Sequence, residues 1–69
     1  MEIVKLRDEY IKLGQALKAA NLVSSGVEAK IVIQNGQVKV NHVTEEQRGK
    51  KLHDGDIIEY NGHEVMISA

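Results

Sequence analysis

The hydrophobic period of the chain changes near Gly36, and this change limits the folds that the chain can adopt. Before Gly36 the apolar residues recur at helical spacing, whereas after it they alternate with polar residues. Helical segments followed by a run of strands are typical of the α+β class. The 69 residues suffice for one small domain, which we expect to span residues 1–69.

Two helices are expected in the first half, after a short strand over residues 3–6. The first helix starts at Lys12 and ends at Asn21, a residue type that tolerates the left-handed conformation. Its apolar stripe consists of Leu13, Ala16, Leu17 and Ala20, and Leu22 and Val23 return to the core.

The second helix is predicted from its capping residues. Ser25 and Glu28 fit a capping box, in which the serine oxygen accepts a free N–H and the glutamate reaches back. The apolar face of this helix contains Ala29, Val32 and Ile33, extended by Ile31, and the helix stops at Gln34-Asn35-Gly36.

A small antiparallel sheet is expected after Gly36. Strands are predicted at 37–41, 51–52, 57–60 and 63–67, and Asn61-Gly62 is a strong hairpin signal between the last two. A polar loop over 42–49 has Val43 as its only aliphatic anchor, and Asp54-Gly55-Asp56 forms a turn.

Composition argues against a membrane protein and against most enzyme classes. No stretch approaches the roughly 20 apolar residues of a membrane span, so we expect a soluble, cytoplasmic, monomeric protein. There is no cysteine, the three histidines lack the spacing of a zinc site, and no phosphate-binding loop is complete. We therefore expect no cofactor, no metal and no catalytic activity.

Basic residues point to a nucleic-acid partner although the net charge is −1. Arg48, Lys50 and Lys51 fall within four positions around a glycine, and clustering on one face matters more than total charge. Tyr10 and Tyr60 are the only aromatic residues, so base stacking is not the main mechanism. With base stacking excluded as the main mechanism, we expect the protein to recognise the backbone shape of a structured RNA.

The order of three motifs resembles the RNA-binding domain family named after ribosomal small-subunit protein four. The motifs are Lys12-Leu13-Gly14-Gln15-Ala16-Leu17, Ser25-Gly26-Val27-Glu28-Ala29 and Gly36-Gln37-Val38-Lys39-Val40-Asn41, followed by Gly55-Asp56 before the last strands. The segments 13–15 and 48–52 look like the short stand-alone bacterial branch of this family.

This resemblance implies the alpha-L fold, in which two antiparallel helices pack on a small curved, mainly antiparallel sheet. It also implies that the helix pair and the following strand and loop face structured ribosomal or transfer RNA, in an action on the ribosome or its assembly. The expected RNA-binding residues are Lys12, Gln15, Ser25, Lys30, Lys39, Asn41, Arg48, Lys50 and Lys51.

Three positions depart from the family pattern. Gly26 replaces the usual arginine, Gly14 replaces an aspartate, and His42 replaces the turn glycine. Lys30 and the basic residues 48–51 are expected to compensate for the missing arginine. The missing arginine and the near-neutral charge also motivate an alternative, a protein-interaction module with the same fold. A DNA-binding helix pair is a third alternative. It ranks below the other two because the second helix presents only Lys30 and Gln34 for contact with base edges.

Overall fold

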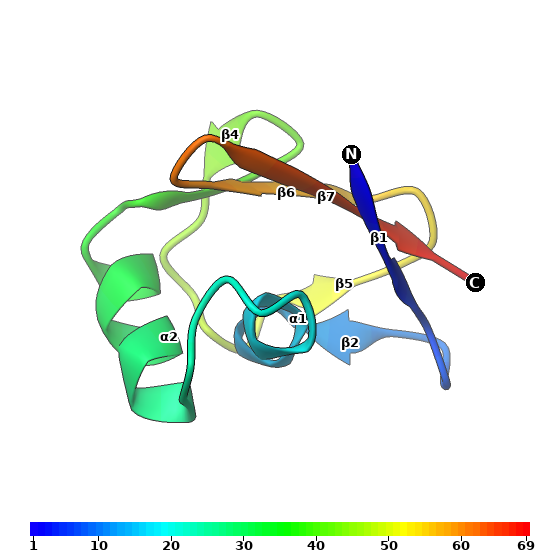
Figure 1. Ribbon diagram of the computed structural model, residues 1–69, viewed down its shortest axis with the longest axis horizontal. Coiled ribbons are helices and arrows are strands. Elements are labelled where there is room, and N and C mark those ends of the chain that lie inside the picture. The colour runs from blue at the N-terminus through cyan, green and yellow to red at the C-terminus, as the bar shows by residue number, and fades with distance from the viewer.

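The computed structural model describes all residues, 1–69, as two helices packed beneath a twisted sheet. Figure 1 looks along the axis of α1, with α2 beside it and the sheet above both helices. The elements are β1 (Glu2–Lys5), β2 (Ile11–Lys12), α1 (Leu13–Ala19), α2 (Gly26–Gln34), β3 (Val38–Val40), β4 (Val43–Thr44), β5 (Lys51–Leu52), β6 (Ile57–Tyr60) and β7 (His63–Ser68).

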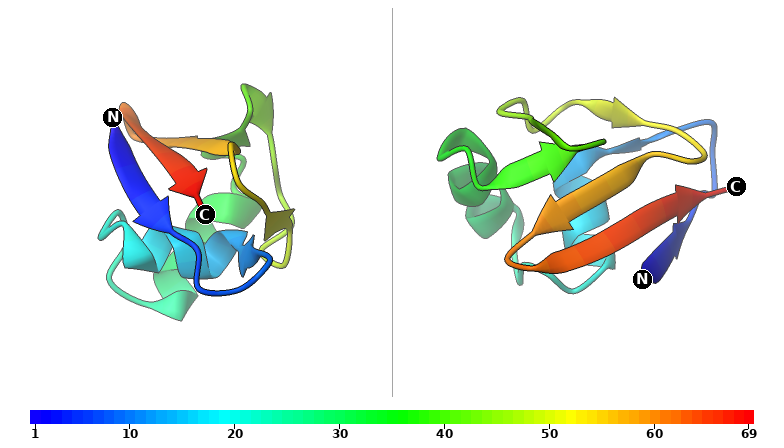
Figure 2. Two further views of the ribbon diagram at one scale, coloured as in Figure 1. Left: turned by 90° about the vertical axis from the view of Figure 1, so that its right-hand side faces the viewer. Right: turned by 90° about the horizontal axis from the view of Figure 1, so that it is seen from above.

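The main sheet has the order β1-β7-β6-β3-β4, and a second sheet pairs β2 with β5. All pairs are antiparallel except β1 with β7, which run parallel. Figure 2 shows this sheet from above, with β1 at the edge next to β7. The α+β class and the mainly antiparallel sheet expected from the sequence are confirmed.

One apolar core lies between the sheet and the two helices. It contains 14 buried aliphatic residues, and no polar or charged side chain is buried with them. Leu17 from α1, Ile33 from α2 and Ile58 from β6 are completely inaccessible to water. Alternation along β3 buries Val38 and Val40 and leaves Lys39 exposed, as the period of two predicts.

The predicted helix ends are largely correct. Ser25 Oγ accepts a hydrogen bond from the Glu28 N–H at 3.1 Å, which confirms the cap of α2. The Glu28 carboxylate bonds the N–H and the hydroxyl of Ser24 instead of the Ser25 N–H. Asn21 follows α1 with a φ of 59°, the left-handed conformation expected after a helix.

Three details of the sequence-based expectation were wrong. Ile31 is 52% exposed and does not extend the buried face of α2, because it lies on the opposite side from Ile33. Val43 is 69% exposed and anchors nothing; it pairs with Val40 as part of β4, which the sequence suggested was loop. The two-residue strand β2 was also missed.

The turns use left-handed residues, and several of these are not glycine. Asn61 and Gly62 have φ values of 52° and 81°, which confirms the predicted hairpin between β6 and β7. Asn41 and His42 adopt φ values of 51° and 71° between β3 and β4. His42 Nδ1 lies 2.8 Å from Glu59 Oε1 on the neighbouring strand, and this contact helps to hold the histidine where the family has glycine.

No helix of this fold is long and apolar enough to cross a membrane.

Two isoleucines on α2 provide a test of the core. Replacing buried Ile33 by alanine should lower the free energy of unfolding by about 2–5 kcal/mol, because the substitution leaves a cavity. The matched control Ile31→Ala removes the same atoms from an exposed site and should change it by about 0.5 kcal/mol or less. Urea unfolding measures both, and equal losses would contradict the assigned faces of α2.

Candidate RNA-binding site

The basic segment Arg48-Gly49-Lys50-Lys51, which we call the basic loop, forms the cap of helix α1. The Leu13 N–H donates to the Lys50 carbonyl at 2.9 Å, and the Gly14 N–H donates to the Arg48 carbonyl at 3.1 Å. The first N–H groups of a helix have no partner within the helix, so the loop supplies the missing acceptors. The backbone of residues 48–50 is thereby fixed against the start of α1.

Gly14 allows this close approach. A Cβ atom at this position would lie 2.8 Å from Arg48 Cγ, closer than side-chain atoms pack in proteins. The aspartate that the family has at this position would therefore displace the Arg48 side chain from its place. The departure at Gly14 is thus explained by the packing of Arg48 on the helix.

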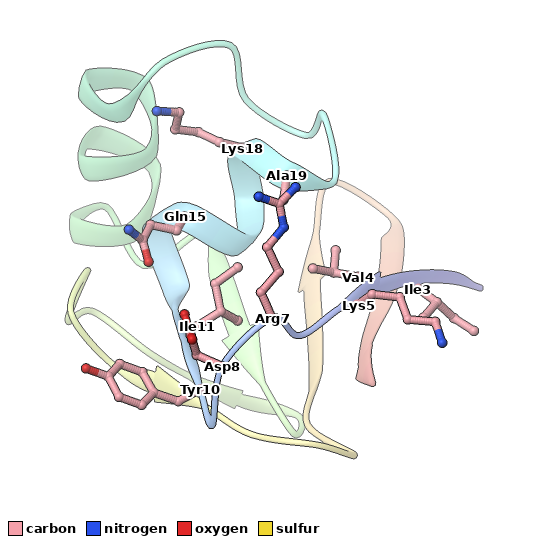
Figure 3. Close-up of a pocket in the computed structure, with 10 residues that line it drawn as sticks. All are labelled: Ile3, Val4, Lys5, Arg7, Asp8, Tyr10, Ile11, Gln15, Lys18 and Ala19. Atoms are coloured by element: carbon pink, nitrogen blue, oxygen red, sulfur yellow. The ribbon is translucent and has the colours of Figure 1, made fainter. Parts of the chain in front are cut away.

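A groove opens between α1, the start of α2 and this loop, with a volume of about 350 Å³. We call it the basic groove, and it is lined by Lys12, Gly14, Gln15, Lys18, Gly26, Ala29, Arg48 and Gly49. Figure 3 shows Lys18 extending from α1 toward α2. Three cationic side chains from two parts of the chain therefore face one depression.

The N-terminus of α2 adds hydrogen-bond donors to the basic groove. Ser25 bonds the N–H groups of Glu28 and Ala29, which leaves the N–H groups of Gly26 and Val27 without a partner in the helix. A Cβ atom at Gly26 would meet nothing within 4 Å, so this end of the groove is open. Free N–H groups at a helix N-terminus are suited to phosphate oxygens.

The lysines and arginines are not neutralised by contacts within the protein. The chain has nine of them and ten carboxylate side chains, yet the only ion pair within 4.0 Å is His42–Glu59. Lys51 instead places its ammonium 4.8 Å from the centre of the Tyr10 ring. The cations of the basic groove therefore remain available to an external anion.

A second hollow of about 410 Å³ lies on the other side of the basic loop. It is lined by Val40, Asn41, Val43, Glu45, Lys50, Lys51, His53 and Asp56. The Asn41 side chain is already engaged, since its Nδ2 donates to Asp56 at 3.0 Å and its Oδ1 accepts from the Ile57 N–H at 2.9 Å. This asparagine joins the β3–β4 turn to the start of β6.

Asp56 is the centre of this hydrogen-bond network. Burial acts to raise the pKa of its carboxyl, but hydrogen bonds from the His53 N–H and the Asn41 amide act against it, as do the nearby charges of His53 and Lys50. The net result is a pKa below the usual value of an aspartate. The folded protein therefore favours the charged form of Asp56.

The nine expected RNA-binding residues do not form a single cluster. Lys12, Gln15 and Arg48 line the basic groove, and Asn41, Lys50 and Lys51 line the second hollow. The remaining three, Ser25, Lys30 and Lys39, line neither.

Lys39 lies on the outer face of the sheet, away from the helices, where it stands opposite Glu59 on β6. Sequence reasoning did not include Lys18 in the site, although its spacing of three from Gln15 places both on one face of α1.

The arrangement offers no candidate metal centre. No group of three or more histidine, aspartate or glutamate side chains lies close enough to hold a metal ion. The fold and the basic groove define instead a small α+β domain that presents unpaired cations and free backbone donors to an anionic polymer.

Comparison with known proteins agrees with this class. Residues 4–68 match the S4 domain, so the chain belongs to the S4 domain family. The S4 domain is a non-catalytic RNA-binding module, which confirms both the expected family and the expected non-enzymatic class.

Two bacterial relatives are similar over most of their length. The chain is 39% identical over 59 residues to the probable ribosome maturation protein RlbA of Bacillus subtilis, covering 86% of this chain and 83% of that protein. It is 35% identical over 60 residues to the putative RNA-binding protein YbcJ of Escherichia coli, covering 87% and 86%.

Solved structures confirm the fold. The solution structure of Escherichia coli YbcJ, described as revealing an AlfaL motif involved in RNA binding, matches with a TM-score of 0.77 and 33% identity over 100% of this chain and 89% of that chain. The 30S ribosomal protein S4e of Thermoplasma acidophilum matches with a TM-score of 0.70 and 27% identity, over 84% of this chain and 31% of that chain.

A methyl group at position 14 should disturb the site. Gly14→Ala should lower the free energy of unfolding by about 1 kcal/mol and weaken RNA binding, because the added Cβ displaces Arg48. Gly49→Ala is the matched control, since a Cβ there meets nothing within 4 Å. Thermal unfolding and an RNA titration compare the two variants; equal behaviour would mean that the contact of Gly14 with Arg48 is unimportant.

Acid should weaken the fold through Asp56. Because its pKa is lowered by folding, its contribution to stability is present above the unfolded pKa, near 4, and is lost as the pH falls through the lower folded value. The free energy of unfolding, measured with urea between pH 5 and roughly pH 2, should fall less steeply in Asp56→Ala than in the parent protein. The control Glu9→Ala, at an exposed residue outside the network, should retain the parent slope.

Proposed function

We propose that the protein binds structured ribosomal or transfer RNA through the basic groove, and that it acts in the maturation of the ribosome. The observation that carries this proposal is the convergence of Lys12, Lys18 and Arg48 on one groove with no carboxylate paired to any of them. Phosphate oxygens are the ligands that such a set of cations and free helix N–H groups binds.

The kind of RNA follows from what the groove lacks. Its lining contains no aromatic side chain, so it offers no platform on which successive bases of a single strand would stack. An A-form helix presents phosphates and 2′-hydroxyl groups in a fixed geometry, and it is recognised mainly by shape. The groove is therefore suited to the backbone of a folded RNA.

The link to the ribosome is supported by the relatives. RlbA, 39% identical to this chain, is named a probable ribosome maturation protein, and the chain also shares its fold with a protein of the small ribosomal subunit. We infer a cytoplasmic role on ribosomal precursors, performed by the 69 residues as a single monomeric domain that requires no cofactor.

A second function, contact with a protein partner, is favoured by one observation. Val27 and Ile31 are 69% and 52% exposed and lie one turn apart on α2. Two adjacent exposed aliphatic side chains give α2 an apolar strip beside the basic groove. Binding of the protein to a ribosomal protein, in place of RNA, is the outcome that would favour this alternative.

The test is a fluorescence-anisotropy titration against ribosomal RNA, transfer RNA and duplex DNA at two salt concentrations. We expect binding to RNA in preference to DNA, weakening as salt rises. The variant Lys12→Ala/Lys18→Ala/Arg48→Ala should bind all RNAs more weakly. Its slope of log affinity against log salt should be smaller by roughly 0.7–0.9 for each phosphate that the variant no longer neutralises.

Lys39→Ala is the matched control, because Lys39 is an exposed lysine on the opposite face of the sheet. It should bind RNA like the parent protein. An equal loss in Lys39→Ala would place the RNA on the sheet, and unchanged binding of the triple variant would contradict the role of the basic groove. Absence of salt-dependent RNA binding in the parent protein would overturn the proposal itself.

A further inference from the structure

A third depression lies on the other side of α1 from the basic groove, and none of the family motifs accounts for it. It has a volume of about 490 Å³ and lies between α1 and the segment that leads from β1 into β2. We call it the α1 hollow. Its lining includes Arg7, Asp8, Tyr10 and Ile11 from that segment, together with Gln15 and Lys18 from α1. Its size falls within the roughly 300–1,000 Å³ of small-molecule sites.

The α1 hollow is continuous with the basic groove over the exposed side of α1. Gln15 and Lys18 line both depressions, and both side chains are exposed. A polymer that rests in the basic groove therefore reaches the hollow by crossing a single turn of helix. Of these two residues, Lys18 extends its ammonium toward α2, on the side of the basic groove.

Tyr10 provides an aromatic surface at one end of the hollow. Tyr10 is 37% exposed as a residue, and Figure 3 shows it at the end away from Ala19. The Lys51 ammonium lies 4.8 Å from the ring centre, and the His53 ring lies 6.3 Å away at an angle of 51°. Neither Lys51 nor His53 lines the hollow, so both support the ring from outside it.

The other side chains of the hollow have the chemistry that a nucleotide needs. Figure 3 shows Arg7 extending along α1 toward Ala19, where its guanidinium, like the Lys18 ammonium, has no carboxylate partner. The Asp8 carboxylate can accept from the N–H groups of a base. Gln15 Oε1 accepts from the Lys12 N–H at 3.4 Å, which leaves its amide group free to donate.

We propose that the α1 hollow takes one unpaired nucleotide of the bound RNA. The base stacks on Tyr10 above the apolar side chain of Ile11, and Arg7 binds its phosphate. This inference rests on the proposed RNA binding and makes it more specific. Bases inside an A-form duplex are stacked and paired, so the preferred RNA carries a bulged or looped-out nucleotide next to its helical backbone.

The experiment compares two RNA hairpins that differ by one bulged adenosine in the stem. The parent protein should bind the bulged hairpin at least roughly fivefold more tightly, the effect of one weakly stacked base. Tyr10→Ala should remove this preference and leave the affinity for the fully paired hairpin unchanged. Tyr10→Phe is the matched control, because it retains the ring and should retain the preference.

A fluorescent base at the bulge gives a second readout that does not depend on affinity. With 2-aminopurine in place of the adenosine, stacking on Tyr10 should quench its emission on binding. The parent protein and Tyr10→Phe should quench it, whereas Tyr10→Ala should not. Tyr10 lies outside the apolar core, so its replacement should leave the fold intact, and circular dichroism of the variant is the check.

Equal affinity of the parent protein for the two hairpins would overturn the α1 hollow as a nucleotide site, while salt-dependent binding to both would leave the proposed function standing. If Tyr10→Ala still prefers the bulged hairpin, the α1 hollow is likewise overturned as a nucleotide site and the proposed function stands. Loss of affinity for both hairpins in Tyr10→Ala would also contradict the inference, because it would show that Tyr10 acts on the basic groove. Absence of binding to either hairpin would overturn both proposals.

Discussion

Two backbone hydrogen bonds, from the N–H groups of Leu13 and Gly14 to the carbonyls of Lys50 and Arg48, hold the functional part of this domain together. Helix α1 has seven residues, and helices shorter than roughly 12–15 residues are marginal on their own. The helix therefore depends on the basic loop for its cap and on the core for its apolar face. The loop in turn has a fixed position because the helix start holds its backbone, while its charged groups pair with no carboxylate.

A second set of hydrogen bonds connects two of the family motifs in the folded chain. The asparagine that ends the Val-x-Val-Asn motif and the aspartate of the Gly-Asp motif are partners, since Asn41 donates to Asp56. Asp56 also accepts from the His53 N–H, which fixes the turn between β5 and β6. These two motifs thus preserve the sheet and the placement of the loop.

Much of the fold could be predicted from the sequence because its signals are local. The Ser25 cap, the apolar stripe from Leu13 to Ala20 and the Asn61-Gly62 turn each act over a few residues, and all three are present. The pairings of β1 with β7 and of β2 with β5 could not be predicted, because they join distant segments. Strand β2 was missed because a strand of two residues has no measurable period. Three of the residues expected from the sequence, Lys12, Gln15 and Arg48, line one groove, whereas the α1 hollow arises from tertiary packing that no motif records.

The absence of any ion pair to a lysine or arginine has a consequence for the kinetics of the complex. In many proteins a cation must leave an internal carboxylate before it reaches a ligand, and this exchange slows both association and release. In the proposed complex with RNA, the cations of the groove have no internal carboxylate to leave, and only dissolved counterions have to leave. The lifetime of such a complex should therefore follow the ionic strength of the surroundings.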